Sequence, residues 1–123
     1  MILVDTSVWV DHLRRSDAGL VRLLESSLVL RHPFVIGELA CGRLHERTVV
    51  LDALSNLPVA PVASQEEALT FLDLHDLASR GIGWVDVHLL ASAALAGDAR
   101  LWTRDKRLRA VADELSLGYV TAR

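Results

Sequence analysis

The chain begins with residues 1–7, MILVDTS, in which four apolar residues precede an acid and two hydroxyl side chains. A short apolar run is typical of a strand buried on both faces, and the hydroxyl side chains can cap a helix that continues to about Arg14. The same change recurs at residues 100–103, an apolar strand pattern followed by a helix pattern over about 106–115. The sequence therefore predicts strands that alternate with helices.

The rest of the chain follows the same alternation. A capping box at residues 64–67 opens one helix, and Gly81 is its expected end. Together the patterns predict one α/β domain over residues 1–123, with a mostly parallel, short-stranded sheet flanked by helices on both faces. The further expected helices cover about 18–27, 33–42, 45–56, 64–81 and 86–96, and the further expected strands cover 28–31, 59–62 and 118–120.

The composition narrows the class of protein. Of the 123 residues 51% are hydrophobic, which favours a packed core over disorder. The single cysteine, Cys41, excludes an internal disulfide and is expected to be a buried thiol in a reducing compartment. No apolar run reaches the roughly 18 residues of a membrane span, and the first residues lack the features of a signal peptide. We therefore expect a cytoplasmic protein with no membrane contact.

Four acids stand out because each follows a predicted strand, begins an apolar helix or interrupts one: Asp5, Glu38, Asp86 and Asp105. Each aspartate could simply cap the helix after it, since Asp is a favoured N-cap. Glu38 is the lone acid in the apolar residues 33–42, where a helix is expected to be buried. Its structural alternative is a salt bridge with an arginine.

Taken together, the acids indicate a metal site. If the strands before Asp5 and Asp105 are parallel neighbours, the two carboxylates meet at one edge of the sheet. Crowded carboxylates repel one another, and a divalent cation relieves that repulsion. Oxygen ligands without a cysteine or histidine pair suit Mg²⁺ or Mn²⁺ better than Zn²⁺.

The four acid segments also resemble motifs of the PIN-domain nucleases. Their order and the chain length are similar to those of the VapC toxins of toxin–antitoxin modules, and the resemblance covers essentially the whole chain. The segments are VDTS at residues 4–7, GEL at 37–39, DVHLLASA at 86–93 and LWTRD at 101–105.

The resemblance implies a PIN fold and a Mg²⁺- or Mn²⁺-dependent endoribonuclease that acts as a toxin. It also implies a homodimer and a cognate antitoxin. The catalytic and metal-binding acids would be Asp5, Glu38, Asp86 and Asp105, with supporting hydroxyls at Thr6 and Thr103. The hydroxyls have ordinary alternatives, helix capping for Thr6 and β propensity for Thr103. This chain has no additional acid close to Asp86, and His88 should point away from the acids into packing.

The charge distribution is compatible with RNA even though the net charge is −3. Without the four site acids the net charge is +1. Five basic residues surround the last acid and would hold the RNA backbone on either side of the cleaved bond, unless they form an ordinary solvated helix face. They are Arg100, Arg104, Lys106, Arg107 and Arg109. The tryptophans at positions 9, 84 and 102 could stack on bases, although packing is the alternative.

Two enzyme classes fit poorly, and one non-enzyme remains open. A haloacid-dehalogenase phosphatase needs Asp-x-Asp, but Ser7 replaces the second acid. A response-regulator receiver needs an acidic pair near the first strand, but Thr6 follows Asp5. The alternative from another class is a catalytically inert PIN-fold module that only binds a protein partner.

Overall fold

The computed structural model describes residues 1–121, which surround a small parallel sheet. Strand β1 (Ile2–Val4) lies in the centre, between β2 (Val29–Leu30) and β3 (Arg100–Trp102). Both neighbours run parallel to β1, so the expected parallel, short-stranded sheet is confirmed. Its residues are apolar and buried apart from Arg100, which explains why such short strands are stable.

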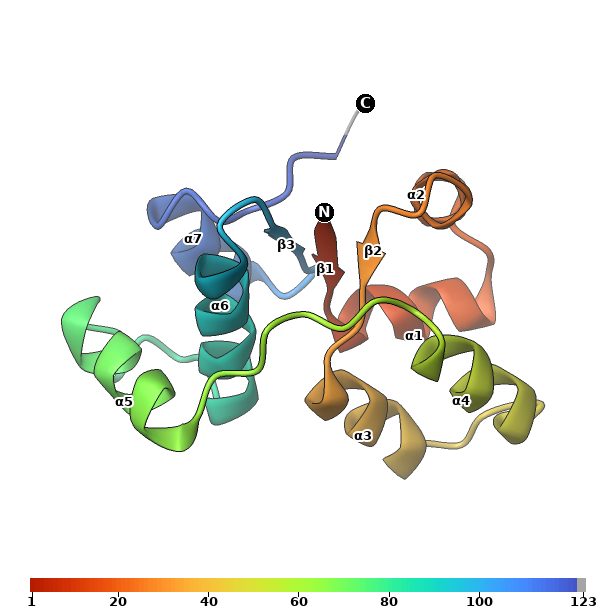
Figure 1. Ribbon diagram of the computed structural model, residues 1–123, viewed down its shortest axis with the longest axis horizontal. Helices are drawn as coiled ribbons and strands as arrows, with labels where there is room; N and C mark the ends of the chain where they lie inside the picture. The colour runs from red at the N-terminus through yellow and green to blue at the C-terminus, as the bar shows by residue number, and fades with distance from the viewer. Residues whose placement is uncertain (122–123) are drawn as a thin grey trace.

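Helices cover both sides of this sheet (Figure 1). The first four lie to one side of β1 and the last three to the other. None of the helices in residues 1–121 combines the length and apolar character needed to cross a membrane. They are α1 (Thr6–Arg14), α2 (Ala18–Glu25), α3 (Pro33–Cys41), α4 (Arg47–Ser55), α5 (Gln65–Leu74), α6 (Trp84–Ala96) and α7 (Lys106–Glu114).

Two expected strands are reduced to single parallel bridges. Residues 59–62 contribute only the bridge between Arg31 and Val59, and residues 118–120 only the bridge between Leu101 and Gly118. Pro61 has no backbone N–H to donate, which prevents the first of these segments from continuing the ladder.

The predicted end of α5 at Gly81 is wrong. The helix ends at Leu74, because Asp76 and Ser79 adopt left-handed backbone conformations with φ of 53° and 63°. Such angles are incompatible with a continuing α-helix. Gly81 instead has a φ of +81° in the loop beside Arg107, where a Cβ atom would lie only 2.8 Å from that side chain.

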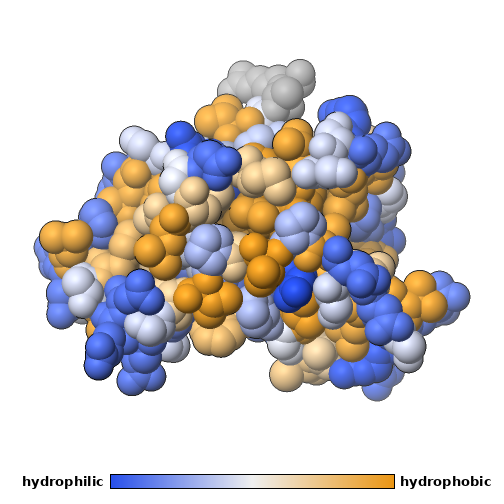
Figure 2. All heavy atoms as spheres, viewed as in Figure 1, coloured by the Kyte–Doolittle hydropathy of each residue, from blue (hydrophilic) through white to orange (hydrophobic). Residues whose placement is uncertain are grey.

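The expectation that α3 is buried all round is also wrong. Val35 and Leu39 face the core, but Phe34, Glu38 and Cys41 are exposed. An apolar helix needs only one face to anchor it, and within residues 1–121 nothing covers the other face. Apolar side chains also reach the surface over the middle of the face shown in Figure 2, while hydrophilic ones predominate at its outer edges.

Candidate functional site

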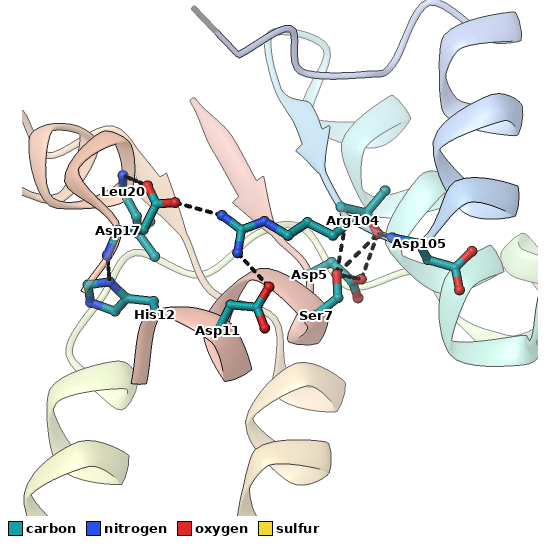
Figure 3. Close-up of polar contacts among 9 residues, drawn as sticks. Asp5, Ser7, Asp11, His12, Asp17, Leu20, Arg104 and Asp105 are labelled. Carbon is teal, nitrogen blue, oxygen red and sulfur yellow. Dashed lines mark hydrogen bonds and ion pairs between the residues drawn. The ribbon is translucent and has the colours of Figure 1, made fainter. Parts of the chain in front are cut away.

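Asp5 lies directly after β1 and is almost completely buried, with 6% of its surface exposed. Its backbone N–H donates to the Trp102 carbonyl at 2.9 Å, which continues the pairing of β1 with β3. Its Oδ2 accepts hydrogen bonds from the hydroxyls of Ser7 and Thr103, each at 2.7 Å (Figure 3). Asp5 is the N-cap residue of α1, but its side chain makes no capping hydrogen bond. The hydroxyls therefore hold this carboxylate in place.

Asp105 follows β3, three residues after its last residue, Trp102. Its Oδ1 accepts from the Leu108 N–H at 3.0 Å, so Asp105 caps α7. Helix capping was the alternative to a metal-binding role for this residue. Its own N–H donates to Thr103 Oγ1 at 3.1 Å. Thr103 thus connects the two aspartates, and parallel pairing of β1 with β3 brings both to the same edge of the sheet. We call this edge, with Asp5, Asp105 and Thr103, the acid edge.

Glu38 approaches the acid edge from α3. Its Oε1 accepts from the Thr6 hydroxyl at 2.6 Å, which joins the start of α1 to α3. Within residues 1–121 Glu38 forms no ion pair, so the alternative of an arginine salt bridge is wrong. Glu38 is exposed, and its single short hydrogen bond leaves carboxylate capacity free for another ligand.

Asp86 lies in the first turn of α6, where its Oδ2 accepts from the Gly83 N–H at 3.0 Å. It is therefore the third residue of its helix and not the N-cap. Burial raises the pKa of Asp86, and the charges of Asp5, Asp105 and Glu38 raise it further against the lowering effect of the Gly83 hydrogen bond. The charges of the other three predicted acids therefore reach Asp86.

The four acids do not form a preassembled cage. Among residues 1–121 no three Asp, Glu, His or Cys side chains are arranged as a metal-binding group. The hydrogen bonds explain this spacing, because Asp86 and Asp105 turn toward backbone N–H groups and Glu38 toward Thr6. The acids are therefore close enough for their charges to affect Asp86, but their side chains do not converge on one position.

The five predicted RNA-binding residues occupy different positions. Arg104 reaches back to Asp11 and Asp17, with nitrogen–oxygen distances of 2.6 Å to both (Figure 3). The hydrogen bond to Asp11 is the largest cause of a raised Arg104 pKa. Arg100 donates to the Ala99 carbonyl at the start of β3, away from the acid edge. The remaining three, Lys106, Arg107 and Arg109, are exposed on α7.

The predicted packing role of His88 is confirmed. Its ring lies edge-on to those of Phe34 and Trp84, at 4.7 Å between centroids in both cases. Trp9 and Trp102 are also buried, whereas Trp84 is 38% exposed. Packing thus accounts for two of the three tryptophans.

Sequence reasoning missed Ser7 and His32. Ser7 is a second donor to Asp5, and its Oγ also accepts from the Arg104 N–H at 3.0 Å. His32 is completely buried, and its Nδ1 caps α3 by accepting from the Phe34 N–H at 3.0 Å. Its position immediately before Pro33, a common first residue of helices, was the available signal.

Known proteins resemble the chain throughout its length. The PIN domain family matches residues 2–114. Ribonuclease VapC32 from two strains of Mycobacterium tuberculosis is 54% identical over 114 residues, which cover 93% of this chain and 92% of the relative.

A solved structure supports the same fold. The crystal structure of FitAcB from Neisseria gonorrhoeae aligns with a TM-score of 0.60 at 21% identity, covering 92% of this chain and 94% of that one. Together with the parallel sheet and the ordered acid motifs, these matches establish the expected α/β fold as a PIN fold. The chain therefore belongs to the PIN-domain family, and within it is similar to the VapC-type ribonucleases.

Proposed function

We propose that this protein is a metal-dependent endoribonuclease and the toxin of a toxin–antitoxin pair. The observation that carries the proposal is that the charges of Asp5, Glu38 and Asp105 all reach Asp86, with Asp5 and Asp105 at the carboxyl end of the paired strands. The similarity to ribonuclease VapC32 supports RNA as the substrate class. The VapC-type resemblance supports a cognate antitoxin, a homodimer and a cytoplasmic location as expectations.

The acids fit Mg²⁺ or Mn²⁺, since all four offer carboxylate oxygens. Burial first, and then repulsion from the other three acids, raises the pKa of Asp86, and a cation would relieve that repulsion. When bound, such an ion would supply an acidified water and offset the negative charge of the phosphodiester. Asp5, Glu38, Asp86 and Asp105 would be its ligands.

The chain's own groups prepare this site. Ser7 and Thr103 orient the Asp5 carboxylate by two hydrogen bonds, and Thr6 orients Glu38 by another. Hydrogen bonds of this kind fix the direction of a ligand and tune its basicity. Thr6 and Thr103 are therefore positioning residues in this proposal.

The test is cleavage of total RNA by protein freed of any bound partner, with Mg²⁺ or Mn²⁺ and with an EDTA control. Asp5→Asn is the site variant, and Asp52→Asn is its matched control because Asp52 is an exposed acid on α4. We expect discrete cuts from the wild type and Asp52→Asn, and none from Asp5→Asn or with EDTA.

Two other outcomes would decide against the proposal. Cuts that persist in Asp5→Asn would come from a contaminating nuclease. If the wild type makes no cuts and Mn²⁺ does not raise its melting temperature, the protein is the inert binding module.

A further inference from the structure

A cavity of about 410 Å³ opens beside the carboxyl end of β3. Its volume lies in the range of small-ligand sites, which is large enough for a nucleotide. The wall comes from α2, the end of β3, the start of α7 and residues 119–121. The lining residues that matter here are Arg22, Trp102, Thr103, Arg104, Arg109 and Tyr119. We call this hollow the arginine cavity.

The aromatic wall of the arginine cavity is held in place by the sheet. The Leu101 N–H donates to the Leu117 carbonyl at 2.7 Å, and the Tyr119 N–H donates to the Leu101 carbonyl at 2.8 Å. These bonds set the Tyr119 ring against Trp102, with 5.4 Å between centroids. Trp102 is buried, whereas Tyr119 is partly exposed and can present its ring to a ligand.

The charge of the arginine cavity is positive and only partly compensated. The charge of Arg104 is neutralised by its ion pairs with Asp11 and Asp17, so its role in the cavity wall is structural. Arg22 and Arg109 also line the cavity, and within residues 1–121 neither forms an ion pair. Two uncompensated guanidinium groups beside a partly exposed aromatic ring match the phosphate and the base of a nucleotide.

Thr103 belongs to both the arginine cavity and the acid edge, although none of the four acids lines the cavity. Thr103 lines the cavity, while its hydroxyl donates to Asp5 at 2.7 Å. A nucleotide in the cavity would therefore lie one side chain away from Asp5.

We propose that the arginine cavity binds one nucleotide of single-stranded RNA adjacent to the cleaved bond. Arg22 and Arg109 hold the phosphate backbone, and the base stacks on Tyr119. This assignment rests on the proposed function and adds a substrate subsite to it. It also divides the basic residues, because Arg22 and Arg109 contact RNA while Arg104 supports the wall.

The test measures binding of a short single-stranded RNA by fluorescence anisotropy, with Asp5→Asn as the background that prevents cleavage. Into it we introduce Arg22→Gln, Arg109→Gln, Tyr119→Ala and Tyr119→Phe. Arg15→Gln is the matched control, since Arg15 is an exposed arginine at the end of α1 that does not line the arginine cavity.

Each arginine variant of the cavity should bind RNA about tenfold more weakly and lower the slope of log affinity against log salt by about 1. Tyr119→Ala should also lose about tenfold, while Tyr119→Phe keeps the stacking face and binds normally. In cleavage assays with Asp5 intact, Arg22→Gln and Arg109→Gln should raise KM more than they lower kcat.

Some results would overturn the inference and leave the proposed function intact. If Arg22→Gln and Arg109→Gln bind RNA like Arg15→Gln while the wild type still cuts, the arginine cavity is not a nucleotide site. If they lose binding to a co-purifying protein but not to RNA, the cavity serves a protein partner. If the protein with Asp5 intact neither binds nor cuts RNA, both proposals fail together.

Discussion

The junctions β1–α1 and β3–α7 have the same sequence pattern and different chemistry. In each, an aspartate follows a short buried strand and precedes a helix. Asp105 uses its carboxylate to cap its own helix through the Leu108 N–H. Asp5 does not cap α1, and its carboxylate is held by the Ser7 and Thr103 hydroxyls instead.

The difference arises from the donors that surround each aspartate. Thr103 comes from the neighbouring strand and reaches Asp5 only because β1 and β3 pair in parallel register. Asp105 has no such neighbour, and the nearest donor is its own helix. The neighbouring strand therefore supplies Asp5 with a donor, Thr103, whereas the carboxylate of Asp105 is held by its own helix.

The largest expected effect is on catalysis at the β1–α1 junction. Asp5→Asn keeps an acceptor for both hydroxyls but removes the charge, so cleavage should fall about a hundredfold or more. Asp105→Ser keeps the helix cap, and its cleavage rate should fall less than that of Asp5→Asn, because the Asp105 carboxylate already accepts a hydrogen bond from the Leu108 N–H. The cleavage rates of the two variants on one defined RNA measure both effects. Equal losses would show that the two junctions contribute alike.

The same contrast should appear in stability. Asp5→Ala leaves the Ser7 and Thr103 hydroxyls without their acceptor in a buried setting, which should cost about 2 kcal/mol. Asp105→Ala loses only a helix cap and should cost about 1 kcal/mol. Urea unfolding of the two variants without metal measures the free energies. A larger loss for Asp105→Ala would reverse the comparison.

Thr103 connects the junctions, so its hydroxyl should matter to both. Thr103→Val removes the bond to Asp5 and the bond from the Asp105 N–H, and cleavage should fall about tenfold as for other residues that orient metal ligands. Thr103→Ser keeps both bonds and is the matched control. If the serine variant is as slow as the valine variant, the Thr103 methyl group and not its hydroxyl is required.

The strands and the four acids could be predicted because their signals are local. A short apolar run followed by an acid marks the end of a buried strand whatever lies beside it. The Thr103 partner of Asp5 could not be predicted, since it reaches Asp5 only after β1 and β3 pair, whereas the Ser7 partner lies two residues away in the chain. The same reason explains Arg104, whose attachment to Asp11 and Asp17 depends on how α1 and α2 fold over the sheet.

Two errors show where local patterns mislead. The apolar composition of residues 33–42 suggested a helix buried all round, but composition does not reveal how much of the chain is available to cover it. Cys41 is therefore exposed, against expectation. Gly81 was a plausible end for α5, yet the left-handed Asp76 ends the helix region earlier.

The stability of the protein also depends on pH through His32, which belongs to neither junction. Burial, and then the charge of His88, lowers the pKa of His32 to about 4. The unfolded chain binds this proton near pH 6.5 and the folded chain only near 4, so stability is highest above pH 6.5 and falls toward pH 4. Between pH 7.5 and 6 the loss should be about 1 kcal/mol.

His32→Asn removes this contribution, because asparagine can still cap α3 and does not titrate. Its unfolding free energy, measured by urea at both pH values, should fall less than that of the wild type, and the remaining fall comes from His88, whose pKa burial also lowers. His45→Asn is the control, since His45 is exposed and the wild-type fall should persist there. If both variants fall equally, His32 is not the source of the acid sensitivity.

The smallest expected effect is that of replacing Asp86, whose pKa is raised by the charges of both junction aspartates, Asp5 and Asp105. Since burial and the neighbouring acids hold its folded pKa above the unfolded value, ionised Asp86 lowers stability at neutral pH. Asp86→Asn keeps an acceptor for the Gly83 N–H and should therefore raise the melting temperature slightly without metal. Adding Mn²⁺ should then stabilise the wild type more than Asp86→Asn. If Mn²⁺ stabilises both equally, Asp86 is no ligand, and the metal site reduces to the two junctions and Glu38.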